Sequence, residues 1–311
     1  MSENNNNIQD ISLELCEIKN KLEILVKIYL SNKFPKVLLL SGSKGIGKFT
    51  LVKHLMHCIF DKDNYNLDKG LINNQTCFSK QFNNGTFPNI VYLPGLDFKA
   101  IKIQDIRNLK SQLLKSTILN NKRFVILDDV ERFNTNSLNA LLKIIEEPTE
   151  NNFFILINNK TKPLLKTIIS RSLEFKYMLS DESRLKIIDY LIKKNNLEVQ
   201  IDYNAINLTP GSFLIFNNIL LKNKIDINGD FLLNLETILN LYKKRKDLNL
   251  INLLLLLTDY YFHVLNKKKV LDIENIAEKK SFVINNINNL VIYNLNQTSI
   301  INAINNKLFN G

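Results

Sequence analysis

Residues 42–50 have the residue types and spacing of a phosphate-binding loop. Gly42 is followed by four residues and then by Gly47 and Lys48, and an apolar run precedes the loop. Glycines let backbone N–H groups turn toward an anion, and the N-terminus of the next helix adds positive potential. Lys48 supplies a point charge for the β- and γ-phosphates. The sequence therefore predicts a nucleotide site at Gly42, Gly45, Gly47 and Lys48.

The residue after the lysine departs from this pattern. A hydroxyl normally follows the lysine and ligates Mg²⁺. Here Phe49 takes that position, and the first hydroxyl comes one residue later, at Thr50. We therefore expect a degenerate site for ATP or ADP with Mg²⁺ that includes Phe49 and Thr50. Whether nucleotide binds at all is left open.

A pair of carboxylates supplies the second half of the predicted site. Asp128 and Asp129 end an apolar run, and an acidic residue at the tip of a strand beside the loop can hold Mg²⁺. Asp128 fits that role. Asp129 stands where hydrolytic enzymes usually have glutamate, and its side chain is one methylene shorter, which is costly for catalytic positioning. The alternative is a polar strand end that caps the next helix.

Strands alternate with helices over the first 178 residues. Apolar runs predict five strands, at residues 37–40, 89–94, 123–128, 153–157 and 173–177. Helical spacing occupies residues 8–30, 101–115 and 134–147, and residues 61–88 have the polar composition of an irregular insertion. This order predicts an α/β domain with a parallel five-stranded sheet covered on both faces.

The strand pattern ends near residue 178. Helical patterns follow at residues 180–194 and 212–222, and only long helical patterns remain from residue 226. The predicted organisation is an α/β domain at 1–178, a small helical domain at 179–224 and a larger helical domain at 225–311. The last part carries more apolar residues than its own core should need, which favours a subunit interface. A self-contained helical bundle is the alternative.

Composition favours a cytoplasmic protein with no membrane segment. Three cysteines without CxxC spacing suit reduced thiols, the N-terminus is polar and acidic, and the longest apolar run is too short to span a bilayer. The formal charge of +11 favours a polyanionic partner such as DNA, and a lysine-rich solvated surface is the alternative.

Three motifs give the chain a resemblance to a known family. They read NALLK at residues 139–143, EEP at 146–148 and SR at 170–171. With the LDDVERF segment before them, they resemble the delta-prime subunits of the bacterial DNA polymerase III clamp loader. The resemblance implies an AAA+ domain, a helical lid and a C-terminal collar. It also implies a five-subunit ring with gamma/tau and delta subunits, which places the sliding clamp on primer-template DNA.

The resemblance gives Arg171 a role in trans. Members of this family carry a Ser-Arg-Cys motif whose arginine reaches the ATP of the neighbouring subunit. Here Ser172 replaces the cysteine and the arginine is retained. Arginine suits this role because its rigid, permanently charged fork stabilises phosphoryl charge. The alternative is a structural salt bridge at the start of the last strand.

Family members also bind zinc through four cysteines in the insertion, and this chain has only Cys58 and Cys77 near it. His54, His57 and Cys58 share one helical face, so a site completed by Cys77 is conceivable. Their spacing matches no established zinc pattern. We therefore expect no zinc, and whether these four residues bind another metal is left open.

The predicted lid lacks a basic residue where active AAA+ motors place an arginine. Residues 210–216 are largely apolar, and the first basic residue is Lys222. Together with Phe49 and Asp129, this favours a non-motor subunit with weak or absent ATPase activity. An active gamma/tau-like motor of the same complex is the alternative. The clamp-loader motifs disfavour an unrelated P-loop kinase or NTPase.

Overall fold

The computed structural model describes residues 13–95, 101, 103–113, 122–268 and 273–309. The chain divides into two compact units. The first comprises Met1–Asn195 with Thr209–Gly211, and the second comprises Asn196–Leu208 with Ser212–Gly311. These limits differ from the three predicted domains, whose boundaries stay predictions.

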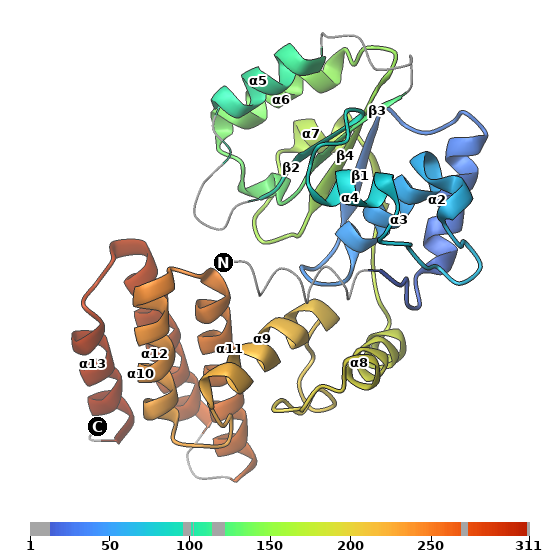
Figure 1. The fold of residues 1–311 in the computed structure, drawn as a ribbon. Helices are drawn as coiled ribbons and strands as arrows, with labels where there is room; N and C mark the ends of the chain where they lie inside the picture. Colours follow the sequence, from blue (N-terminus) through green and yellow to red (C-terminus); the bar gives the residue numbers. More distant parts are fainter. Residues whose placement is uncertain (1–12, 96–100, 102, 114–121, 269–272, 310–311) are drawn as a thin grey trace. The chain divides into compact units, whose positions relative to one another are not determined.

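The first unit contains a parallel sheet with strand order β2-β3-β4-β1-β5 (Figure 1). All of its strand pairs are parallel. The residues of β1, β3 and β4 are buried throughout, as expected for central strands covered on both faces. The predicted five-stranded parallel sheet is therefore confirmed, with these strands: β1 (Val37–Ser41), β2 (Ile90–Leu93), β3 (Arg123–Leu127), β4 (Asn152–Asn158) and β5 (Leu173–Lys176).

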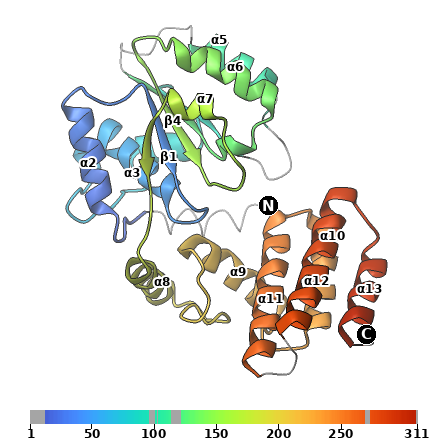
Figure 2. The same ribbon diagram turned by 180° about the vertical axis from the view of Figure 1, so that it is seen from behind.

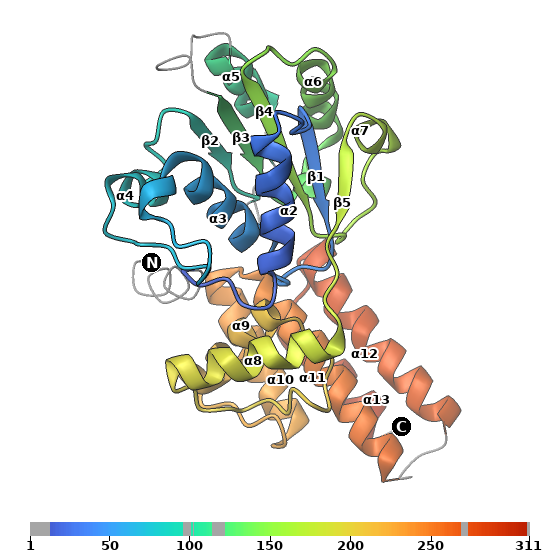
Figure 3. The same cartoon turned by 90° about the vertical axis from the view of Figure 1, so that its right-hand side faces the viewer.

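Helices cover both faces of this sheet (Figure 3). One core cluster joins Leu38 and Leu40 of β1 to α2 (Lys19–Leu30), α3 (Lys48–Phe60) and α4 (Cys77–Asn83). The other joins Val37 and Leu39 to α5 (Ile103–Leu113), α6 (Thr135–Glu146) and α7 (Lys166–Ser170). Alternate residues of β1 thus face opposite helical layers, as the period of a strand requires.

Two predictions for this unit need correction. Of the one or two helices expected at residues 8–30, the described part contains α2, which begins only at Lys19, and residues 1–12 lie outside the described part. Residues 13–15 instead pair with the insertion, since the N–H of Leu15 donates to the carbonyl of Gly70 at 2.8 Å. The insertion at 61–88 is also less irregular than expected, because it contains η1 (Lys62–Asn64) and α4, whose Phe78 is buried.

In the described residues after the sheet there are six helices: α8 (Asp181–Asn195), α9 (Pro210–Asn223), α10 (Phe231–Arg245), α11 (Leu248–Lys267), α12 (Ile273–Tyr293) and α13 (Gln297–Phe309). The last four helices pack as a bundle (Figure 2). Each helix contacts the next one along the chain, and α13 also contacts α10, which closes the bundle. The helix α8 belongs to the first unit.

The bundle uses most of its apolar side chains for its own core. Leu235 and Ile238 of α10 and Leu253, Leu254 and Leu257 of α11 are buried. These buried residues agree with the self-contained bundle that was the alternative, and the subunit interface expected from the apolar surplus stays a prediction. Several apolar side chains of the same helices and of the segment after α12 are exposed, namely Leu233, Ile292, Tyr293, Leu295 and Phe309.

By length and composition α11 is long and apolar enough to cross a membrane. Its buried face packs against α10 and α12, however, which is how a core helix of a bundle behaves.

Candidate functional site

The predicted phosphate loop lies between β1 and α3, at the carboxyl end of the sheet. Gly45 and Gly47 have φ values of 84° and 93°, a region that favours glycine. At Gly42 a Cβ atom would lie 2.2 Å from the carbonyl oxygen of Tyr177. Each of these three positions therefore requires glycine, either because its backbone conformation disfavours other residues or because a Cβ atom would clash.

Lys48 begins α3 and is almost fully buried. Its ammonium donates to the carbonyl oxygens of Gly42 and Ser43, both at 2.7 Å. Burial lowers the pKa of Lys48 to about 8, although the nearby carboxylates, that of Asp128 first, oppose this shift. The lysine is therefore satisfied by the loop's own carbonyls in this chain.

Phe49 packs against an aromatic partner beside the predicted metal ligand. Its ring centre lies 5.0 Å from that of Tyr92 on β2, and the Tyr92 side chain hydrogen-bonds to Asp128. Thr50 lies one position further along α3, which turns it about 100° around the helix axis. The residue directly after Lys48 thus contributes an aromatic ring in place of the metal-binding hydroxyl of the motif, and this ring packs on Tyr92, the partner of Asp128.

The two carboxylates follow β3 as predicted, and both are engaged. Asp128 Oδ1 accepts the N–H of Asp129 at 2.8 Å, while burial raises the pKa of Asp128 to about 6. Asp129 is buried, has a left-handed φ of 50° and accepts a hydrogen bond from the Asn159 side-chain amide. Arg132 lies 4.0 Å from the same carboxylate. Asp129 is therefore held by protein groups and is poorly placed to activate water.

Asn159 and Glu131 are site residues that the sequence interpretation missed. Glu131 Oε1 accepts from the backbone N–H of Asn159 at 3.1 Å and from the Thr161 hydroxyl at 2.8 Å. This buried carboxylate fixes the turn after β4 and so places Asn159 against Asp128 and Asp129. The position of Asn159 directly after a buried strand was the available signal, since the carboxyl ends of parallel strands meet at one edge.

Thr209 and the first residues of α9 are anchored on the phosphate loop. The hydroxyl of Thr209 donates to the Lys44 carbonyl, and the N–H of Gly211 donates to the Gly45 carbonyl, both at 2.8 Å. A Cβ at Gly211 would lie 2.8 Å from Gly45 Cα, so the close approach requires glycine. The next residues of α9 include the buried Phe213 and Phe216. Thr209–Gly211, which clusters with the first unit, contains no basic residue.

Arg171 lies away from the phosphate loop and from the carboxylates that follow β3. It follows α7 and precedes β5, and β5 runs parallel to β1 with Leu173 opposite Leu38. The arginine is thus at the amino end of these strands, whereas the phosphate loop follows their carboxyl end. The strands alone separate the two by roughly 10 Å. The structure therefore does not bring Arg171 together with Lys48 or Asp128.

The Arg171 side chain is about two-fifths exposed and forms an ion pair with Glu146, the last residue of α6. Its Nη2 lies 2.8 Å from Glu146 Oε1, and its Nη1 donates to the Thr167 carbonyl at 3.2 Å. The salt bridge considered as an alternative is thus present in the single chain.

The histidine and cysteine group has ordinary packing partners. His54 Nδ1 lies 2.7 Å from the Tyr65 hydroxyl, and His57 packs edge-on against Phe78 with ring centres 4.8 Å apart. Burial lowers the pKa of His57 to about 4 and raises that of Cys58 to about 12. Among the described residues, no group of three or more His, Cys, Asp or Glu is arranged to hold a metal. That the chain binds no zinc stays a prediction.

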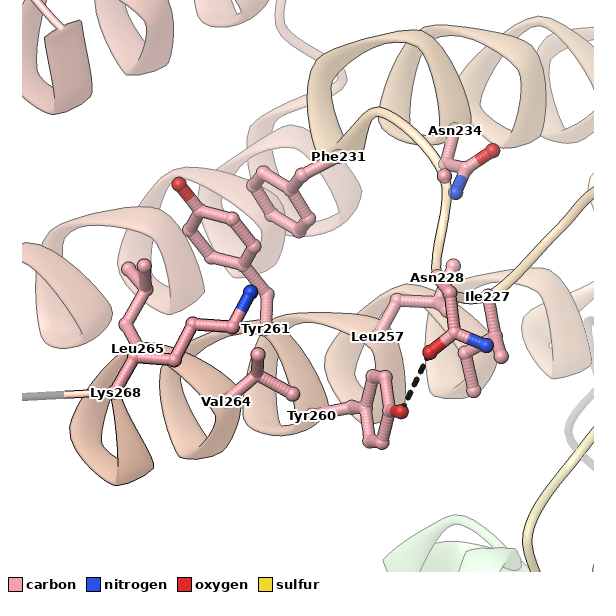
Figure 4. Close-up of a pocket in the computed structure, with 11 residues that line it drawn as sticks. Ile227, Asn228, Phe231, Asn234, Leu257, Tyr260, Tyr261, Val264, Leu265 and Lys268 are labelled. Atoms are coloured by element: carbon pink, nitrogen blue, oxygen red, sulfur yellow. Dashed lines mark hydrogen bonds between the residues drawn. The ribbon is translucent and has the colours of Figure 1, made fainter.

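A hollow of about 250 Å³ lies in the second unit, between the loop before α10 and the second half of α11 (Figure 4). Phe231 and Tyr261 stack in its wall with ring centres 4.4 Å apart, and the Tyr260 hydroxyl donates to Asn228 at 2.7 Å. Its lining is mostly aliphatic and aromatic and contains none of the predicted site residues.

Curated proteins of the DNA polymerase III complex are similar to this chain. A gamma subunit from Buchnera aphidicola subsp. Acyrthosiphon pisum is 28% identical over 209 residues, which cover 61% of this chain and 56% of that protein. A delta' subunit from Buchnera aphidicola subsp. Baizongia pistaciae is 26% identical over 297 residues, covering 88% and 79%. The chain thus spans only a little over half the length of the gamma-subunit relatives it matches.

The fold has a solved counterpart. A DNA polymerase III gamma subunit-related protein from Thermotoga maritima superposes with a TM-score of 0.53 at 18% identity, covering 91% of this chain and 96% of that one. At this identity the likeness concerns the fold alone, which is that of AAA+ proteins.

The profile of the family described as "DNA polymerase III, delta subunit" matches residues 18–179, just over half of the sequence. The match includes β1–β5, the phosphate loop, Asp128 and Arg171. The chain therefore belongs to this family of AAA+ clamp-loader subunits.

Proposed function

We propose that this chain is a non-motor, delta-prime-like subunit of a cytoplasmic DNA polymerase III clamp loader. In this proposal it joins gamma/tau and delta subunits in a five-subunit ring that loads the sliding clamp onto primer-template DNA. It contributes to the activity of the polymerase III holoenzyme through Arg171, which stabilises phosphoryl charge on a neighbour's ATP. Its own site retains at most weak binding of ATP or ADP with Mg²⁺.

The position of Arg171 carries this proposal. The side chain is partly exposed at the amino end of β5, so its own phosphate loop is out of reach. Ile169 and Leu173 beside it are exposed apolar residues, as expected for a surface that another subunit covers. An arginine in such a place can serve a nucleotide only on another chain.

The state of the chain's own site supports the same proposal. The Lys48 ammonium is bound to loop carbonyls, Phe49 and Tyr92 pack beside Asp128, and Asn159 holds Asp129. These contacts leave the site without a metal-binding hydroxyl directly after the lysine and without a well-placed general base. Weak or absent hydrolysis follows from them.

A motor subunit like gamma/tau is the second candidate. The observation that favours it is the intact loop geometry, with positive φ at Gly45 and Gly47 and with Lys48 close enough to Asp128 to influence its pKa. Similarity to gamma subunits is consistent with this candidate as well.

Clamp loading by the reconstituted complex separates the two candidates. We expect Arg171→Ala to lower the clamp-loading rate by about 10³-fold, as for other arginines that act in trans. Lys48→Ala should cost less than about threefold, because the working phosphate site belongs to the neighbour. Arg171→Lys, which keeps the charge but loses the fork, should resemble Arg171→Ala. A larger loss with Lys48→Ala than with Arg171→Ala would favour the motor subunit.

A further inference from the structure

Glu146 ends α6 and Arg171 directly follows α7, and the hydrophobic core between these helices and the sheet sets the distance between the two residues. Ile145 precedes Glu146 at the end of α6, and Ile168 lies one turn before Arg171 in α7. Both isoleucines are buried in the same core cluster. The two charged side chains therefore meet at the surface because the residues next to them are fixed beneath it.

Two acceptors fix the guanidinium of Arg171. The carboxylate of Glu146 binds Nη2 at 2.8 Å, and the Thr167 carbonyl binds Nη1 at 3.2 Å. A guanidinium has five N–H donors, so two such contacts leave further donors for a phosphate. Without these contacts, the long Arg171 side chain would lose conformational freedom only when it becomes immobilised at an interface, and this loss would weaken the interaction.

We propose that Glu146 is a positioning residue for Arg171, which holds the guanidinium in the orientation that meets the γ-phosphate of a neighbour's nucleoside triphosphate. This inference rests on the proposed function of Arg171. Glu146 acts through its acceptor oxygen and does not contact the nucleotide. The pair is exposed and contributes little to stability, so its value lies in orientation.

The position of Glu147 provides a matched control. It is the next residue in the chain and is also exposed, and in the described part of the chain no ion pair involves its carboxylate. Replacing Glu147 removes the same charge from the same surface and leaves the Arg171 contacts in place.

The test measures ATP turnover by the complete reconstituted complex on primed DNA with clamp. We expect Glu146→Ala to lower kcat by about three- to tenfold, the cost of ordering one flexible side chain. The KM for ATP and the association of the subunits should change less than twofold. Glu146→Gln keeps the acceptor oxygen and should retain at least half of kcat, and Glu147→Ala should match the unaltered complex.

Two further variants keep the inference and the proposed function distinguishable. The double variant Glu146→Ala with Arg171→Ala should be no slower than Arg171→Ala alone, because the two residues act as one unit. If Arg171→Ala itself leaves turnover unchanged, the proposed function fails. If Arg171→Ala is slow and Glu146→Ala is unchanged or faster, only the positioning role is wrong. A Glu146→Ala variant that fails to join the complex, or a Glu146→Gln variant as slow as Glu146→Ala, would also overturn it.

Discussion

The ring of Phe49 lies 5.0 Å from the ring of Tyr92, and the Tyr92 side chain hydrogen-bonds to Asp128. This chain of contacts joins the residue after the phosphate-loop lysine to the predicted metal ligand. In an active site of this type a hydroxyl and a hydrated Mg²⁺ would join the same two positions. In this chain, aromatic packing and a hydrogen bond to Asp128 join these two positions.

We expect the isolated chain to hydrolyse ATP far more slowly than the roughly 1–10 s⁻¹ of ordinary enzymes. The metal-binding hydroxyl and the lid arginine are absent, and Asp129 is held by Asn159. Phosphate release from purified protein with ATP and Mg²⁺ measures this rate. Turnover within the ordinary range would show that this chain is a motor.

Replacing Lys48 should stabilise the fold near neutral pH. The pKa of Lys48 falls from 10.5 to about 8, so the folded state binds fewer protons than the unfolded state between these values. The free-energy cost of burying the charged Lys48 ammonium is therefore largest below pH 8, and it disappears as the pH rises toward 10.5. We expect Lys48→Met to raise the free energy of unfolding by about 1–3 kcal/mol at pH 7 and to lose this gain by pH 10.

Thermal or urea unfolding between pH 6.5 and 10 measures this difference. Lys69→Met, which replaces an exposed lysine, serves as the control and should show a flat difference. A Lys48→Met variant that is less stable than the unaltered chain at pH 7 would mean that the two carbonyl hydrogen bonds outweigh the cost of burial.

Gly42 and Gly85 should respond very differently to alanine. A Cβ at Gly42 would lie 2.2 Å from the Tyr177 carbonyl oxygen, a backbone atom that cannot move independently. We expect Gly42→Ala to cost at least about 2–3 kcal/mol. At Gly85 nothing lies within 4 Å, and only its φ of +66° opposes alanine, at about 1 kcal/mol. Urea unfolding compares the two, and equal losses would contradict the close approach at Gly42.

Removing the C-terminal bundle should leave the α/β unit folded but prevent its association with the other subunits. A chain that ends after Lys224 keeps the sheet, both of its helical layers and α9. It loses exposed apolar side chains of the bundle such as Leu233, Ile292 and Tyr293. We expect it to retain the far-UV circular dichroism of the α/β unit but not to co-purify with motor subunits. Assembly of this shortened chain at normal affinity would place the interface in the α/β unit.

The sequence alone determined the sheet, the phosphate loop and the carboxylates at the end of β3. Apolar runs of strand length and glycines at fixed spacing are local signals, and the structure reproduces the strands they predicted to within two residues. The motifs around Arg171 were likewise sufficient to indicate the family that the profile match establishes.

Only the tertiary structure decided what surrounds these residues. Asn159, which follows β4, meets Asp129, which lies just beyond β3, and Arg171, which follows α7, meets Glu146 at the end of α6. Residues 13–15 pair with the insertion instead of extending α2. Packing between distant helices likewise decided which apolar side chains of the bundle are buried and which are exposed. Each outcome depends on which distant segments pack together, and local periodicity carries no information about that choice.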